Sequence, residues 1–173
     1  ILRAGLVLAL ITGIYFILLF FVFPKKFLLK ELMIGTVYSM ALFLAPVYAN
    51  NDFVVDQSWL ILWLEIFLLA IANTLIFAWY DHEIDRSDGH TSLTADLGRP
   101  MIFRIALGLL IAVTALVSYH MIFFGEFLHH GIILLMSITL LYSLLADRAL
   151  KTNDSYRIVG DAVFIIRIVI LIT

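Results

Sequence analysis

Long apolar runs dominate the sequence, and each has the length that a helix needs to cross a lipid bilayer. About 20 residues of α-helix span roughly 30 Å of hydrocarbon, and such runs lie at about 4–23, 31–49, 58–80, 101–124, 128–146 and 158–173. The runs are apolar on every side and do not alternate with a period of two, so they predict lipid-embedded helices and not barrel strands. The sequence therefore predicts an all-α, polytopic membrane helix bundle with six transmembrane helices.

The composition supports this class. The chain of 173 residues is 64% hydrophobic and 14% charged, whereas about a quarter of the residues of soluble domains are charged. No soluble insert or linker is visible, so residues 1–173 are expected to form a single transmembrane domain. It is expected to be a fragment of a longer chain, because it begins and ends inside apolar runs. The chain has no cysteine, which excludes disulfides, thiolate catalysis and zinc–thiolate sites.

The basic residues predict which way the bundle faces. Nine of the eleven fall on alternate connections between the apolar runs: Lys25, Lys26, Lys30, Arg86, Arg99, Arg104, Arg148, Lys151 and Arg157. The intervening connections, 50–57 and 125–128, carry none. Because basic connections stay in the cytoplasm, Asp88 and Lys151 are expected on the cytoplasmic side and Asp52 on the opposite side.

Residues 79–90, WYDHEIDRSDGH, contain five charged residues and two histidines within a largely apolar chain. Asn73, Phe77, Asp81 and Asp85 follow one another at i, i+4 spacing, which places them on one helix face if the helix continues to about residue 85. These carboxylates and Asp88 cannot all ionise cheaply beside a low-dielectric core without a cation. Oxygen ligands favour Mg²⁺, which often bridges carboxylates to substrate phosphates. The spacing predicts a metal–diphosphate site, and it leaves open a solvated turn at a helix end.

The segment DHEIDRSDGHTSL, residues 81–93, with Gly98 after it, resembles the second aspartate-rich motif of the UbiA-type intramembrane prenyltransferases. That motif runs D-x-x-x-D-R-x-x-G-x-x-T-L-P-V. Ser92 stands where the family usually has Thr, and Thr94 stands where it has Pro. The resemblance implies a nine-helix fold of which the six helices here would be helices four to nine.

The first aspartate-rich motif of that family would lie before Ile1. A near-match at Asn51–Asp56 differs from it in spacing, and the charge pattern puts it on the opposite side of the membrane from Asp81. We therefore expect Asp52 and Asp56 to lie in an exposed loop.

The resemblance implies a Mg²⁺-dependent transfer of an isoprenyl group from a polyprenyl diphosphate to an aromatic or other lipophilic acceptor. Asp81 and Asp85 would be the catalytic, metal-bridging carboxylates, with Asp88 as a further metal ligand and Arg86 as a diphosphate partner. Further substrate-binding candidates on the same side of the membrane are Asn73, Arg157 and Asp161, and candidates for the wall of an isoprenoid tunnel are Trp79, Tyr80, Tyr142 and Phe164. An ion pair between Arg157 and Asp161 at i, i+4 is the alternative for those two residues.

Two other functions stay open. A non-catalytic UbiA-like subunit that scaffolds a larger membrane complex, with membrane-protein partner subunits, would account for the departures at Ser92 and Thr94. An ion or proton pathway would use charges inside the spans. The expected partners are the lipid bilayer, the polyprenyl diphosphate and its acceptor, with membrane-protein subunits added in the scaffold alternative; no nucleic acid is expected.

Two charged residues and three histidines lie inside or near the expected spans, away from the acidic segment. Glu65 and Arg167 are both expected near mid-bilayer, where an unpaired charge costs roughly 2.5–3.5 kcal/mol. We therefore expect either that the two residues pair inside the bundle or that each hydrogen-bonds backbone or hydroxyl groups of other helices. His120, His129 and His130 are expected to be interfacial or packing residues.

Overall fold

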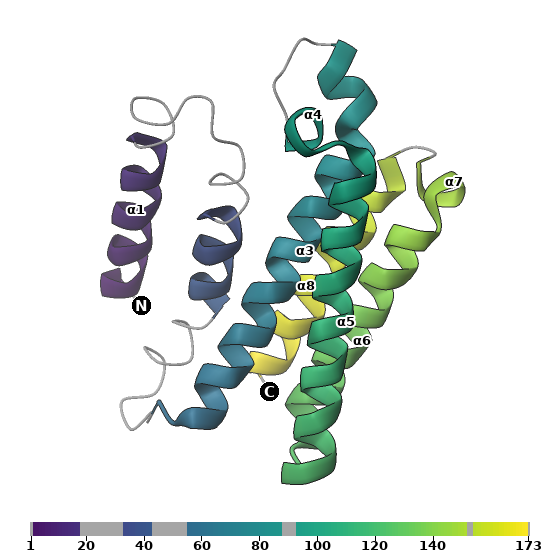
Figure 1. Ribbon diagram of the computed structural model, residues 1–173. Helices are drawn as coiled ribbons and strands as arrows, with labels where there is room; N and C mark the ends of the chain where they lie inside the picture. The colour runs from purple at the N-terminus through teal and green to yellow at the C-terminus, as the bar shows by residue number, and fades with distance from the viewer. Residues whose placement is uncertain (1, 18–32, 43–54, 88–92, 152–153, 173) are drawn as a thin grey trace.

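The protein is described from a computed structural model, which defines residues 2–17, 33–42, 55–87, 93–151 and 154–172. Within these ranges every regular element is a helix, so the all-α prediction is confirmed (Figure 1). The helices are α1 (Leu2–Ile17), a short helix over Met33–Leu42, α3 (Gln57–Ser87), α4 (Leu93–Leu97), α5 (Arg99–Phe124), α6 (Phe127–Leu145), α7 (Asp147–Leu150) and α8 (Ser155–Ile172).

Three of these helices are long and apolar enough to cross a membrane: α3 as far as Ile84, α5 and α6. They match the expected spans 58–80, 101–124 and 128–146 closely, and α8 covers most of the expected span 158–173. The first two expected spans fall partly outside the described residues. The count of six spans and their placement in a nine-helix fold therefore stay predictions.

The ends of α5 follow from local chemistry. Pro100 lies in its first turn, where the missing N–H has no intrahelical acceptor in any case. Gly98 and Gly125 flank the helix with φ values of 78° and 73°, a conformation that glycine adopts without steric cost. Only Gly125 and Glu126 separate α5 from α6, so the two helices form a tight antiparallel pair.

The core lies between α3, α5, α6 and α8, which pack side by side in Figure 1. Helix α5 buries one stripe at spacings of three and four residues: Ile102, Ala106, Leu110, Val113, Val117 and His120. Helix α3 lies deeper, since five consecutive residues, 69–73, are buried. The outward faces of α5 and α6 stay apolar, with exposed Ile111, Ile122, Phe123, Leu135 and Ile138. Such outward faces are typical of helices that meet lipid, since helices of soluble proteins carry polar residues there.

Two glycines set how closely helices approach α3. A Cβ atom at Gly35 would lie 2.8 Å from the Ile71 side chain. A Cβ atom at Gly160 on α8 would lie 2.5 Å from Cε1 of Phe77 and 2.6 Å from Oδ1 of Asn73. All three distances are shorter than real Cβ contacts, so at these two glycines the backbone packs directly onto side chains of α3.

Candidate functional site

The acidic motif lies at the carboxyl end of α3. The helix continues unbroken to Ser87, which meets the condition on which the shared helix face depended, and Asp81 and Asp85 hold i, i+4 positions on it. The side chains of Asp85 and Arg86, and the whole of Asp88, lie outside the described residues. Asp81 is therefore the member of the predicted metal site whose surroundings the structure defines.

Asp81 joins α3 to the last helix. Its Oδ1 atom accepts a hydrogen bond from Nη2 of Arg157 at 2.8 Å and another from the hydroxyl of Tyr156. Nε of Arg157 in turn donates to the Tyr156 hydroxyl oxygen at 3.1 Å. The structure thus places Arg157, a predicted substrate-binding residue, beside the first carboxylate of the motif.

Arg157 does not form the ion pair with Asp161 that i, i+4 spacing offered as the alternative. Among the described side chains, Arg157 of α8 forms its ion pair with Asp81 of α3. Asp161 is exposed on α8, one turn further along the chain. The structure therefore does not bring Asp161 into contact with the Asp81 group.

Tyr156 is the residue of this site that the sequence reasoning missed. It is 2% exposed, and its ring stacks on Tyr80 with a centroid distance of 4.3 Å and an interplanar angle of 8°. The Tyr80 hydroxyl donates to the backbone oxygen of Ser143 at 2.7 Å, so the stacked pair ties α3 to both α6 and α8. In a chain rich in aromatic residues no spacing singles Tyr156 out, because its position depends on how α8 docks against α3.

Electrostatics keeps the donors of this group protonated. Burial, together with the hydrogen bond to Asp81, raises the pKa of the Tyr156 phenol, and the hydrogen bond to Asp81 raises the pKa of the Arg157 guanidinium. Both residues precede the apolar run of α8. At neutral pH the phenol and the guanidinium therefore both donate to the Asp81 carboxylate.

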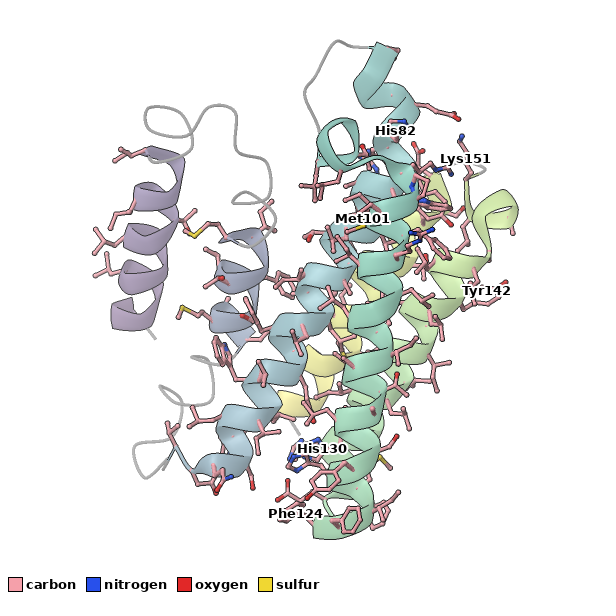
Figure 2. All side chains as sticks on the ribbon, in the orientation of Figure 1. His82, Met101, Phe124, His130, Tyr142 and Lys151 are labelled. Atoms are coloured by element: carbon pink, nitrogen blue, oxygen red, sulfur yellow. The ribbon has the colours of Figure 1, made fainter. Side chains whose placement is uncertain are left out.

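More charged groups surround this end of the bundle. Nζ of Lys151 lies 2.6 Å from Oε2 of Glu83, and both side chains are largely exposed. The guanidinium carbon of Arg99 lies 4.2 Å from the centroid of the Trp79 ring, a cation–π distance. Figure 2 shows Lys151, which follows α7, and His82 of α3 at this same end, where Arg99 of α5 and Arg157 of α8 also lie.

The other sequence candidates lie deeper or point away. Asn73 is 6% exposed and faces Gly160 about two turns before Asp81; its Oδ1 has no hydrogen-bond partner among the described residues. Of the tunnel candidates, Trp79, Tyr80 and Phe164 are buried, whereas Tyr142 is 60% exposed. Tyr142 therefore lies on the outer surface of α6.

The described side chains do not by themselves form a magnesium site. Among them, no three His, Asp or Glu residues lie close enough to hold a metal ion. Asp81 accepts two hydrogen bonds on one oxygen atom, from donors that a cation would repel or displace. A magnesium site would thus need Asp85 and Asp88, whose carboxylates lie outside the described residues.

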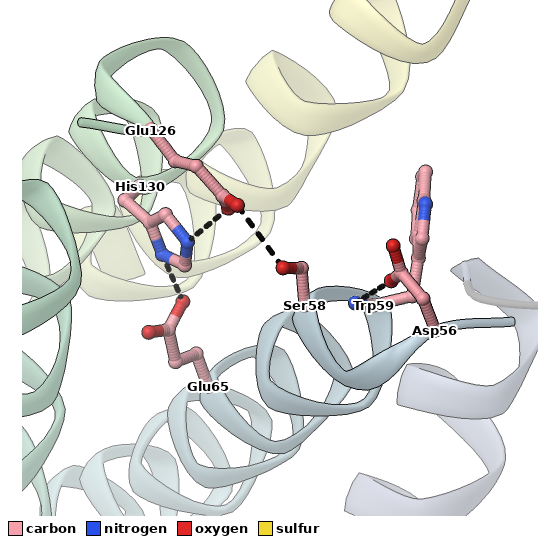
Figure 3. A network of polar contacts seen from close by, with 6 residues as sticks. All are labelled: Asp56, Ser58, Trp59, Glu65, Glu126 and His130. Atoms are coloured by element: carbon pink, nitrogen blue, oxygen red, sulfur yellow. Dashed lines mark hydrogen bonds and ion pairs between the residues drawn. The ribbon is translucent and has the colours of Figure 1, made fainter. Parts of the chain in front are cut away.

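A second polar group lies at the opposite end of α3, away from the predicted site (Figure 3). Nδ1 of His130 lies 2.8 Å from Oε2 of Glu65, and Nε2 lies 3.2 Å from Oε2 of Glu126. Ser58 donates to the other oxygen of Glu126 at 3.0 Å. Glu65 thus has a partner on α6 that the sequence did not predict, while the expected contact with Arg167 falls on a side chain outside the described residues.

His130 and Asp56 are two further residues at this end of α3 whose surroundings were predicted from the sequence. His130 was expected to be an interfacial or packing residue; it is 1% exposed and hydrogen-bonded through both ring nitrogens. Asp56 is exposed as expected, and its Oδ1 accepts a hydrogen bond from the backbone N–H of Trp59 in the first turn of α3. Asp56 therefore acts as a helix cap, far from Asp81.

Comparison with known proteins identifies no family: no family model matches the chain, and neither a curated protein nor a solved structure matches it. A functional assignment therefore rests on the motif and on the geometry around Asp81.

Proposed function

We propose that the chain is part of a membrane-embedded prenyltransferase of the UbiA type, which transfers an isoprenyl group from a polyprenyl diphosphate to a lipophilic acceptor. The observation that carries the proposal is the meeting of Asp81 with Arg157 and Tyr156 at one end of a bundle of long apolar helices. An anion-binding guanidinium beside an acidic motif, next to an apolar interior, suits a substrate with a diphosphate head and a hydrocarbon tail.

The proposed placement is that of an integral, multi-pass membrane protein with the Asp81 end in the cytoplasm. The exposed apolar faces of α5 and α6 support the membrane location. The basic residues Lys151, Arg157 and Arg99 all lie at the Asp81 end, which supports the orientation, because basic segments remain cytoplasmic.

In this proposal, Arg157 exchanges its partner when the donor binds. Its side chain is 53% exposed, so the guanidinium can turn from Asp81 toward a diphosphate and bind two of its oxygens in parallel. The Tyr156 hydroxyl stays beside it as a second donor. Negative charge grows on the leaving diphosphate, so donors already aimed at that position lower the barrier.

Mg²⁺ belongs to the proposal through the family resemblance alone. When bound between carboxylates and diphosphate, it would neutralise the leaving group. Asp85 and Asp88 would be the ligands on this chain together with Asp81.

The test is release of diphosphate from an allylic isoprenyl diphosphate by the full-length protein with Mg²⁺ and an acceptor extract. Asp81→Asn and Asp85→Asn should each lower turnover by about 10²–10³-fold, the usual cost of losing one group that stabilises developing charge. Asp56→Asn, which keeps a capping oxygen at the other end of α3, should leave turnover unchanged. Full turnover in both motif variants would refute the assignment.

A non-catalytic scaffold subunit with the same fold is the second candidate. The observation that favours it is that Asp81 already closes a contact between α3 and α8 with two donors, a structural use of the residue. In that case Asp81→Asn would lower the thermal stability of the protein, and no diphosphate release would be measured in the wild type under any acceptor mixture. Co-purification of partner subunits that Asp81→Asn releases would support this second candidate.

A further inference from the structure

The contacts among Glu65, His130 and Glu126 are one donor short if each residue is in its ordinary protonation state at neutral pH. A neutral imidazole carries one N–H, and its other ring nitrogen accepts. Here both ring nitrogens of His130 face carboxylate oxygens, at 2.8 Å and 3.2 Å, and a carboxylate is only an acceptor. Two ionised carboxylates and a neutral imidazole would therefore leave one pair of acceptors facing each other without a hydrogen.

Burial makes that arrangement costly. Glu65 is 0% exposed and His130 is 1% exposed, so water cannot replace the contact between these two residues. A buried acceptor that faces another acceptor in place of a donor destabilises the fold. One additional proton satisfies both contacts, because His130 can be an imidazolium between two carboxylates, or Glu65 can be a carboxylic acid that donates to Nδ1.

The surroundings leave a route for this proton to exchange. The Glu126 side chain is 40% exposed, and it contacts His130, which contacts the buried Glu65. The titratable groups beside His130 are His120 on α5, whose ring stacks on that of His130 with a centroid distance of 5.1 Å, and His129, the preceding residue of α6. Asp56, at the start of α3, instead accepts a hydrogen bond from the backbone N–H of Trp59. Glu126, His130 and Glu65 therefore form a chain from an exposed carboxylate to a buried one.

We propose that Glu65, His130 and Glu126 form a proton-binding site that holds two hydrogens at neutral pH and couples the packing of α3 against α6 to pH. The site lies about 24 Å along α3 from Asp81, at 1.5 Å per residue, so it is separate from the predicted catalytic end. In the orientation proposed above, it responds to pH on the non-cytoplasmic side.

The sign of the coupling follows from the proton count. The folded protein holds a proton that the separated groups release at neutral to alkaline pH, so stability falls as pH rises and the proton leaves. Losing it breaks one of the two contacts of His130. The helices α3 and α6 are then held less tightly, with little change in the rest of the core.

Direct detection of the hydrogens is the first test. Purified full-length protein with ¹⁵N-labelled histidine should show, at pH 7, either an imidazolium at His130 or a neutral His130 together with an infrared band of a protonated carboxylic acid that Glu65→Gln removes. Either result supports the site. A neutral His130 with no such band would overturn the proposal.

Thermal unfolding in detergent gives the second test. The thermal unfolding midpoint of the wild-type protein should fall by about 2–4 °C or more between about pH 6 and about pH 9. This is the shift expected for losing one of the two hydrogen bonds of His130. Glu65→Gln should flatten this profile, because the amide supplies a permanent donor to Nδ1. Asp56→Asn should keep the wild-type profile. A flat wild-type profile, or equal slopes in the wild type and Glu65→Gln, would overturn the coupling.

Discussion

Nη2 of Arg157 lies 2.8 Å from Oδ1 of Asp81, so an arginine of the last helix is the ion-pair partner of the first carboxylate of the acidic motif. The two residues are far apart in the sequence, and the Tyr156 hydroxyl connects to both. A motif that is local in the sequence thus depends on α8 for its electrostatic environment.

Replacing Arg157 tests its proposed role as a diphosphate ligand. Arg157→Met should weaken binding of an isoprenyl diphosphate by about 10–100-fold, since a hydrogen bond to a charged group contributes about 1.5–3 kcal/mol. Arg157→Lys should recover part of the loss, because lysine keeps the charge without the planar fork. Calorimetric titration of the full-length protein measures both. The control is Arg104→Met, which replaces an exposed arginine of α5. Equal losses of diphosphate affinity in the two Met variants would contradict a specific role for Arg157.

The close approach at Gly160 predicts a large cost for one added methyl group. Gly160→Ala would push a Cβ atom to 2.5 Å from the Phe77 ring, so we expect it to lower the free energy of unfolding by about 1–3 kcal/mol, as overpacking does. Gly108→Ala on α5, where nothing lies within 4 Å, should be neutral or stabilising. Thermal unfolding in detergent compares the two. Similar effects of both substitutions would mean that α8 does not pack on α3 as described.

The Tyr80 hydroxyl predicts a stability difference between two tyrosines. Tyr80→Phe removes the donor to the backbone oxygen of Ser143 and leaves a buried acceptor unsatisfied, which should cost about 1–3 kcal/mol. Tyr142→Phe, one residue from Ser143 but 60% exposed, should change the stability by less than about 0.5 kcal/mol. Urea or thermal unfolding measures the pair, and a Tyr80→Phe protein as stable as the Tyr142→Phe protein would contradict the contact.

Orientation can be tested by labelling, because the chain has no cysteine of its own. A cysteine at Asp56 should react with a membrane-impermeant reagent added to intact cells, whereas one at Lys151 should react only after the cells are opened. Both positions are exposed, so a difference between them reports sidedness. Labelling of Lys151→Cys alone from outside would reverse the proposed orientation.

The helices were predictable because their cause is local. Apolar runs of membrane-spanning length, Pro100 in the first turn and Gly125 after the last define α5 closely from the sequence. The expected span of α3 stopped at Tyr80 because the hydropathy falls there, and its continuation to Ser87 was only a condition of the i, i+4 argument for the carboxylates.

The contacts of the site could not be predicted in the same way. Tyr156 and Gly160 matter because α8 docks on α3, and no periodicity within either helix specifies that docking. Glu65 was recognised as a charge that needs a partner. Its contact with His130 depends on the connection between α5 and α6, which brings the first turn of α6 beside α3. Asp81, by contrast, was a candidate from the spacing of the carboxylates together with the motif around them, and its role as a metal ligand stays a prediction.

The two-residue join at Gly125 and Glu126 has a consequence for how the protein is made. If α5 and α6 cross the bilayer, a connection this short cannot leave one of them outside while the other inserts. The two must enter as a hairpin, and neither can invert without its neighbour. The sidedness of both helices is then decided in a single step during synthesis, by the basic residues at their far ends.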